Sequence, residues 1–213
     1  MSDSQQHFFT ADPEVASARQ TINMMLGDVS AKLDTDTGVF SADRLDRGTR
    51  ILLDHAPMPP QSGNILDLGC GYGPIAVAVA LRAPQAKVWA VDVNNRALGL
   101  TRDNAARAGL TNITAVRPEG MPEDVRFDAI YSNPPIHIGK AALHQLLTEW
   151  LPRLTPSGVA YQVVQKNLGS DSLAKWLNEN GYPTERLASQ VGYRILRTTL
   201  PDTGPSTEQA AGE

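Results

Sequence analysis

The feature that most constrains the fold is a regular alternation of short apolar runs and amphipathic segments, which begins near residue 64. Apolar runs predict seven strands, at 65–68, 87–91, 113–116, 127–131, 159–165, 186–191 and 194–199, and helical periodicity predicts helices at 74–82, 96–108, 140–151 and 171–180. Strands that alternate with helices form a parallel sheet covered on both faces, and the last two runs, with no helix between them, predict an antiparallel hairpin. The sequence therefore predicts a Rossmann-like α/β fold with a seven-stranded, mostly parallel sheet.

The chain of 213 residues has the size of one domain with terminal additions. Residues 1–60 are predicted to form a short N-terminal extension, made of short strands and a helix at 41–55, that packs on the main domain at 61–200. The polar run 34–38 is predicted to be the turn between the short strands. Residues 201–213 are rich in Pro, Gly, Ser, Thr and Ala without apolar periodicity, which predicts a disordered tail.

Composition excludes several classes of protein. No apolar run reaches the roughly 18 residues of a membrane span, and the polar start at residues 1–7 is unlike a signal peptide, so we expect a cytoplasmic protein without a membrane partner. The single cysteine, Cys70, has no partner for a disulfide and no metal-ligand spacing, so no metal site is expected. A net charge of −4 supplies no overall attraction to nucleic-acid phosphate, so an RNA substrate would need a local basic patch.

A glycine-rich turn follows the first strand of the alternating region, in the sequence Ile65-Leu-Asp-Leu-Gly-Cys-Gly-Tyr-Gly73. Gly69, Gly71 and Gly73 would let the backbone approach a nucleotide-like cofactor closely, although the same turn can also serve only to pack a helix on a strand. Asp67 stands two residues before the first glycine, where a carboxylate would repel a pyrophosphate. The spacing therefore favours a cofactor without phosphates.

S-adenosylmethionine meets that condition because it carries an ammonium, a sulfonium and a ribose diol, which a carboxylate such as Asp67 attracts. Asp92, at the end of the second strand and followed by Val93, is predicted to accept hydrogen bonds from both ribose hydroxyls. Glu119, just after the third strand, is predicted either to contact the adenine edge or to belong to a plain loop. Together with Phe40 and Asn133, these residues make up the predicted cofactor site.

A second motif, Ser132-Asn-Pro-Pro-Ile136, directly follows the fourth strand at the edge of the sheet where ligands of such folds bind. An exocyclic amine or a carboxamide is a poor nucleophile, because its lone pair is delocalised into the π system. The Asn133 side-chain oxygen and the Pro134 carbonyl can each accept one N–H of such a group, and Pro134 and Pro135 fix the turn. Ile136 would supply apolar contact, and His137 is either a proton relay or a structural histidine.

These motifs resemble the small-methyltransferase family of class I methyltransferases, which includes the guanine-N2 methyltransferases of small-subunit ribosomal RNA. The resemblance covers roughly residues 35–198 and is carried by these segments: Gly38-Val-Phe-Ser41, Leu45-Asp-Arg-Gly-Thr49, Asp67–Gly73, Asp92, Ser132–Ile136 with Gly139-Lys140, and Gly192-Tyr-Arg-Ile-Leu196. It implies that Val39, Phe40 and Ser41 and the helix after them lie beside the cofactor pocket, with Asp67, Gly69, Gly71 and Asp92 around the cofactor, and that residues 133–136 face the target amine.

The resemblance also implies a substrate, which is an exocyclic amine of RNA and most specifically guanine N2 of 16S ribosomal RNA, methylated by a monomer on ribosomal RNA or the small subunit. Many relatives carry an aromatic residue where this chain has Ile136, which weakens the expectation of base stacking there. Six basic residues predicted near the mouth of the pocket either contact phosphate or form a solvated face: Arg44, Arg47, Arg50, Lys140, Lys166 and Arg194.

Two alternatives to the RNA methyltransferase stay open. A protein glutamine offers the same NH₂ group as a base, but enzymes of that kind usually have Asn-Pro-Pro-Tyr and a helical N-terminal domain, and both are absent here. A noncatalytic scaffold that binds S-adenosylmethionine is the other alternative.

Overall fold

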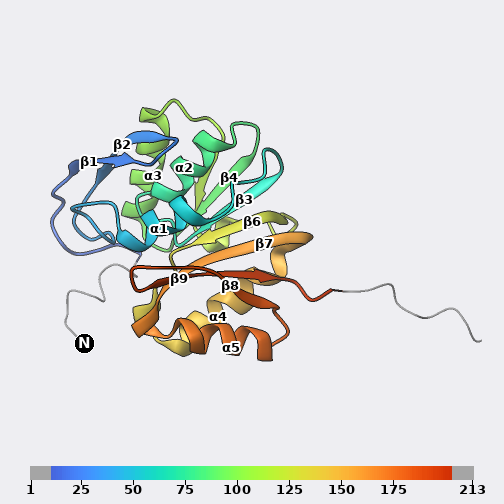
Figure 1. Cartoon of the computed structure of the whole chain (residues 1–213). Helices are drawn as coiled ribbons and strands as arrows, with labels where there is room; N and C mark the ends of the chain where they lie inside the picture. Colours follow the sequence, from blue (N-terminus) through green and yellow to red (C-terminus); the bar gives the residue numbers. More distant parts are fainter. Residues whose placement is uncertain (1–10, 203–213) are drawn as a thin grey trace, which may run out of the picture.

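The computed structural model describes residues 11–202, which form an α/β structure around one seven-stranded sheet (Figure 1). Its strands, in the order β5-β4-β3-β6-β7-β9-β8, are β3 (Asn64–Leu68), β4 (Lys87–Val91), β5 (Ile113–Val116), β6 (Phe127–Ser132), β7 (Leu154–Gln165), β8 (Thr184–Gln190) and β9 (Tyr193–Thr199). Strands β3 to β7 are parallel, and β9 pairs antiparallel with both β7 and β8. The predicted fold class and the C-terminal hairpin are confirmed.

Helices cover both faces of the sheet (Figure 1). The first face carries α1 (Arg47–His55), α2 (Pro74–Arg82) and α3 (Asn95–Arg107), and the second carries α4 (Lys140–Trp150) and α5 (Ser170–Glu179). Short 3₁₀ turns lie at Pro118–Gly120, Ile136–Ile138, Leu151–Arg153 and Lys166–Leu168. None of the helices between residues 11 and 202 is long and apolar enough to cross a bilayer.

Each face of the sheet contributes to its own apolar core. Successive side chains of a strand point to opposite faces, so Ile65 packs with the core under α1 to α3, and Leu66 packs with the core under α4 and α5. Because both faces are buried, the inner strands read as continuous apolar runs, which is why their positions could be predicted.

The N-terminal part forms a separate two-stranded hairpin of β1 (Gln20–Met25) and β2 (Ser30–Thr35). Its turn lies between Leu26 and Val29, where the Leu26 N–H donates to the Val29 carbonyl at 3.0 Å. The prediction of a turn at 34–38 was therefore wrong, because Asp34 is paired within β2 and the Gly-Asp pair at 27–28 supplies the reversal. The division of the chain at residue 60 stays a prediction, and most of the predicted tail, residues 203–213, lies outside the described residues.

The helix predicted at 41–55 begins only at Arg47, so its first six residues were predicted wrongly. Asp46 is the N-cap, and its side chain accepts from the Thr49 N–H at 2.9 Å. A capping aspartate adopts a non-helical backbone conformation, which separates the helix from the loop before it. In that loop Ser41 has a positive φ of 55°.

We predict that Gly158→Ala destabilises the fold, because an added Cβ would lie 2.6 Å from the Phe127 carbonyl oxygen where β6 and β7 shift register. Backbone atoms on both strands must then move, at a cost of about 1–3 kcal/mol of unfolding free energy. The matched control is Gly99→Ala in α3, where a Cβ meets nothing within 4 Å and a gain of about 0.5–1 kcal/mol is expected. Urea denaturation of both variants measures the difference, and equal stabilities would contradict the prediction.

Candidate active site

A cavity of about 500 Å³ opens at the carboxyl ends of β3, β4 and β6, within the usual range for small-molecule pockets. Strand β3 lies between β4 and β6, so chain order reverses at this point of the sheet, as is typical of ligand sites in open α/β folds. Its walls include the glycine-rich turn, the Asn133–Ile136 turn and residues 39–41. The tertiary structure thus brings the two predicted motifs into one cavity.

Gly69 and Gly71 line the cavity with φ values of 75° and 56°, which favour glycine. A Cβ added at Gly71 would meet no protein atom within 4 Å, so the absent side chain leaves space open to a ligand. Gly73 has a different role, since it is the N-cap of α2 and does not line the cavity. A Cβ there would lie 2.8 Å from the Thr101 hydroxyl, so Gly73 serves the packing of α2 against α3.

Asp92 lines the cavity at the end of β4, where its carboxylate is held by two backbone groups. Its oxygens accept the N–H of Gly71 and the N–H of Asn94, each at 2.9 Å. Burial raises the pKa of Asp92, while these hydrogen bonds act in the opposite direction. Each oxygen keeps acceptor capacity for a further hydroxyl, and Val93 beside it lines the same cavity.

Asp67 lies behind the glycine-rich turn and does not line the cavity. One of its oxygens accepts the Ala76 N–H at 2.9 Å, and the other has no hydrogen-bond partner among the described residues. Burial, with a smaller contribution from the Asp92 charge, raises the pKa of Asp67 to about 8. Its predicted attraction to the cofactor would therefore act from the second layer of the site.

The Asp67 carboxyl predicts a pH dependence of stability. Its folded-state pKa of about 8 is above the ordinary 3.8, so the folded protein keeps a proton that the unfolded chain releases. The unfolded state binds fewer protons, so the free energy of unfolding should fall as pH rises from about 4 to 8 and level off above that range. Asp67→Asn should flatten this dependence in urea denaturation between pH 5 and 9, and parallel curves for the two proteins would contradict it.

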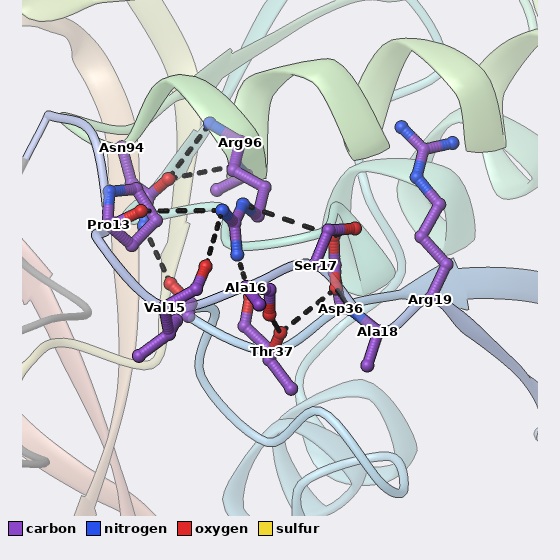
Figure 2. Close-up of polar contacts among 12 residues, drawn as sticks. Pro13, Val15, Ala16, Ser17, Ala18, Arg19, Asp36, Thr37, Asn94 and Arg96 are labelled. Atoms are coloured by element: carbon purple, nitrogen blue, oxygen red, sulfur yellow. Dashed lines mark hydrogen bonds and ion pairs between the residues drawn. The ribbon is translucent and has the colours of Figure 1, made fainter.

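Residues 36–38, which lead into the wall at residues 39–41, are fastened by contacts that sequence reasoning missed (Figure 2). The Arg96 guanidinium donates to the Thr37 carbonyl at 2.7 Å and to the Val15 carbonyl at 2.9 Å. Asn94 donates from its side chain to the Gly38 carbonyl at 2.9 Å. Its position before a predicted helix was an N-cap signal that could have identified it.

This wall is formed by Val39, Phe40 and Ser41, all of which line the cavity as predicted. Phe40 is 45% exposed, so part of its ring is available to a ligand. Glu119 lies elsewhere, since its side chain is 65% exposed and the Arg117 guanidinium holds its carboxylate at 2.6 Å. Pro118 lines the cavity in its place, and an adenine contact by Glu119 stays a prediction without support from this geometry.

The Asn133–Ile136 turn lines the opposite side of the cavity. The Asn133 amide nitrogen donates to the Asp46 carboxylate at 2.7 Å and to the Thr49 hydroxyl at 3.0 Å. Neither partner was among the predicted site residues. The Pro134 carbonyl accepts the Ile136 N–H at 2.8 Å and keeps one lone pair for a second donor.

Comparison with known proteins identifies the family. Residues 30–197 match the family described as the methyltransferase small domain, which covers most of the chain. The chain belongs to the methyltransferase small domain family. The Bacillus subtilis (strain 168) protein "Uncharacterized protein YbxB" is 32% identical over 195 residues, which cover 90% of this chain and 97% of that protein.

Other members of the methyltransferase small domain family are longer than this chain. Ribosomal RNA small subunit methyltransferase C of Ectopseudomonas mendocina (strain ymp) is 34% identical over 191 residues, which cover 87% of this chain but 56% of that protein. The solved T. thermophilus 16S rRNA N2 G1207 methyltransferase (RsmC) in complex with AdoMet and guanosine has a TM-score of 0.71 at 23% identity, covering 88% of this chain and 52% of that one. The latter likeness shows the fold.

The predicted basic residues divide into two groups in this methyltransferase small domain. Arg50 pairs with Asp54 at 3.6 Å, and Arg194 pairs with Asp171, so both have carboxylate partners. Among the described residues, the other four have no ion pair: Arg44, Arg47, Lys140 and Lys166, all of them exposed.

Three predictions remain, which concern a metal site, Cys70 and His137. Within residues 11–202, no group of three His, Cys, Asp or Glu side chains is arranged to hold a metal ion. Cys70 is buried beside the cavity, and burial raises the pKa of its thiol. The side chain of His137 lies outside what the structure describes, so its role stays a prediction.

Proposed function

We propose that this protein binds S-adenosylmethionine in the cavity and methylates an exocyclic amine of RNA, specifically guanine N2 of 16S ribosomal RNA. The observation that carries the proposal is that Asp92 and the Asn133–Ile136 turn line the same cavity. The Asp92 carboxylate can accept hydrogen bonds from a ribose diol, and the turn can accept hydrogen bonds from an amine. A methyl donor and its acceptor could therefore meet in this cavity.

The chain's residues fit the proposed cofactor. S-adenosylmethionine, when bound, supplies an electrophilic methyl group on a sulfonium. The turn at Gly69 and Gly71 gives its backbone room against a ligand, and Asp92 has acceptor capacity for both ribose hydroxyls. Val93, Pro118 and Ile75 supply apolar surface in the cavity, which suits the flat face of a purine.

The acceptor side of the cavity suits an NH₂ group. The Asn133 oxygen and the free lone pair of the Pro134 carbonyl would each accept one N–H, which draws the nitrogen lone pair out of conjugation and toward the methyl group. With S-adenosylmethionine bound, its sulfonium would supply the methyl group, and the amine held by Asn133 and Pro134 would lose one proton to water. Positioning and stabilisation of developing positive charge account for the rate increase, and no strong base is needed.

RNA as the substrate is supported by two observations. Arg44, Arg47, Lys140 and Lys166 are exposed, lack carboxylate partners in the described part of the chain, and lie within three residues of residues that line the cavity. Cations of this kind would offset the net charge of −4 where the RNA backbone approaches. The names of the longer relatives point to ribosomal RNA as well. With them we propose a monomer that acts in the cytoplasm on ribosomal RNA or the small subunit.

The test uses purified protein, radiolabelled S-adenosylmethionine and three acceptor fractions from a strain without the protein, namely total RNA, ribosomal subunits and total protein. Label in small-subunit RNA that Asn133→Ala abolishes would support the proposal, and nucleoside analysis should then identify N2-methylguanosine. Label only in protein would replace RNA with a glutamine side chain. No label in any fraction, together with calorimetric binding of the cofactor, would favour a scaffold.

A further inference from the structure

We propose that Asp46 and Thr49, here called the amide clamp, are positioning residues that fix Asn133 so that only its carbonyl oxygen can meet the target amine. The inference rests on the proposed function and adds to it two residues from the N-terminal part of the chain. Both line the cavity, and both lie at the start of α1, in the Leu45–Thr49 segment that carries part of the family resemblance but to which no role was predicted.

The orientation of the Asn133 amide follows from the chemistry of its neighbours. An amide nitrogen has two N–H groups, and here they have two acceptors, the Asp46 carboxylate at 2.7 Å and the Thr49 hydroxyl at 3.0 Å. A carboxylate can only accept, so the opposite orientation would place the amide oxygen against a negative charge. The oxygen must therefore face away from the clamp, and no described donor bonds to it.

The clamp is itself held in place by the start of α1. The same Asp46 oxygen that binds Asn133 accepts the backbone N–H of Thr49 at 2.9 Å, so the helix cap and the amide contact share one atom. Thr49 and Leu52 are buried, and Leu52 packs in the core under α1 to α3. Because α1 is packed in this core, the fold fixes the distance between α1 and the Asn133 turn.

The clamp also brings negative charge to the reaction. A hydrogen bond from the amide nitrogen to a carboxylate polarises the amide and makes its oxygen a stronger acceptor. The negative charge of Asp46 also acts on two tyrosines that line the cavity. Burial is the larger cause of the raised pKa values of Tyr72 and Tyr193, and the charge of Asp46 is the next. Positive charge that develops on the attacking nitrogen would be stabilised in the same way.

A fixed acceptor limits the chemical class of substrate. A group with N–H donors, such as an exocyclic amine or a carboxamide, can bind to the Asn133 oxygen. A ring nitrogen without hydrogen, or a carbonyl, would place its own lone pair against a lone pair of the Asn133 oxygen. The Asn133 oxygen would then have no hydrogen-bond donor. The clamp therefore accounts for selection of amines over other nucleophilic atoms of a base.

The test is a swap of the two side chains that share the 2.7 Å hydrogen bond. Asn133→Asp places two carboxylates in contact and should lower kcat about 100-fold, and Asp46→Asn should lower it about tenfold by removing the charge. In the double variant the new amide at position 46 can donate to the new carboxylate at position 133, whose second oxygen again faces the amine. The kcat should therefore recover about tenfold from the Asn133→Asp value. In Asp46→Asn alone the amide oxygen can still accept the Thr49 N–H, so the cap of α1 is kept. In the double variant the amide nitrogen takes the place of that shared oxygen, so the cap bond is lost and the unfolding midpoint should lie below that of Asp46→Asn.

The control is Asp54→Asn, which removes one charge from the exposed side of the same helix and should leave kcat unchanged. All variants are assayed with the acceptor fraction that the wild type labels, together with the KM for each substrate and the midpoint of urea unfolding. Recovery of kcat in the double variant at unchanged KM for S-adenosylmethionine would support the clamp. Recovery of the unfolding midpoint without recovery of kcat would overturn it, because the contact would then be structural only.

The two proposals fail in distinguishable ways. Label in protein instead of RNA would overturn the proposed RNA substrate. The kcat values of the swapped variants would then be measured with that protein as the methyl acceptor. If the wild type labels no fraction, the proposed function fails, and the unfolding midpoints decide whether the contact exists. Independent effects of the two substitutions on the midpoint would then overturn the clamp.

Discussion

Replacing Asn133 with alanine is expected to lower kcat for methyl transfer about 100- to 1,000-fold, because a preorganised group that acts in the transition state is lost. The residue stands at the cavity wall with its nitrogen occupied by Asp46 and Thr49, which leaves the oxygen for the acceptor. Alanine keeps the backbone of the turn but supplies no acceptor. The affinity for S-adenosylmethionine should change far less than kcat, since the interaction is made with the amine.

Single-turnover kinetics with saturating cofactor, combined with calorimetry, measure the two effects separately. Asn23→Ala is a suitable control, because Asn23 is exposed on β1 and does not line the cavity. A variant that keeps more than a tenth of the wild-type kcat would contradict the role of the Asn133 oxygen. Equal losses of kcat and cofactor affinity would assign Asn133 to cofactor binding instead.

The second large effect is expected at Asp92, where alanine should raise the dissociation constant for S-adenosylmethionine about 100-fold or more, since two charge-assisted hydrogen bonds would be lost. The loop should also loosen, because the N–H groups of Gly71 and Asn94 lose their acceptor. Asp92→Asn keeps the shape and one carbonyl oxygen, so a smaller increase of about tenfold is expected.

Isothermal calorimetry with the cofactor measures both constants, and the control is Asp103→Asn at the exposed ion pair with Arg19. Asp92→Asn keeps a carbonyl oxygen for one of the two backbone N–H groups, so its unfolding midpoint should change less than that of Asp92→Ala. Loss of affinity in a variant with an unchanged unfolding midpoint would assign Asp92 to binding. An unchanged dissociation constant in Asp92→Ala would remove it from the site.

Much of the fold could be predicted because its signals are local. Strands such as β4 are short apolar runs between polar turns, and helices such as α2 follow a glycine and begin with proline, so neighbouring residues determine them. The errors fell where two local signals competed. The loop before α1 extends to the helix cap at Asp46, further than the apolar spacing predicted. In the first hairpin, the turn lies at Gly27 and not in the polar run 34–38.

The candidate site could be predicted only in part. Gly69, Gly71, Asp92 and Asn133 belong to short motifs whose geometry is set within a few residues, and all line the cavity. Glu119 was selected by its place after a strand, but the Arg117 side chain, whose direction the sequence does not reveal, holds its carboxylate away from the cavity. Arg96 and Asp46 were missed because their partners are distant in sequence.

By itself the sequence determined the alternation of strands and helices, the glycine-rich turn and the Asn-Pro-Pro turn, since each depends on the backbone preferences of adjacent residues. Only the tertiary structure decided that Asp46 and Thr49 meet Asn133, residues 84 or more positions apart. It also decided that Arg96 holds Thr37, just before the wall at residues 39–41, and that Asp67 lies behind the cavity. Such contacts depend on how the core packs α1 and α3 against the sheet, and packing is a property of the whole chain.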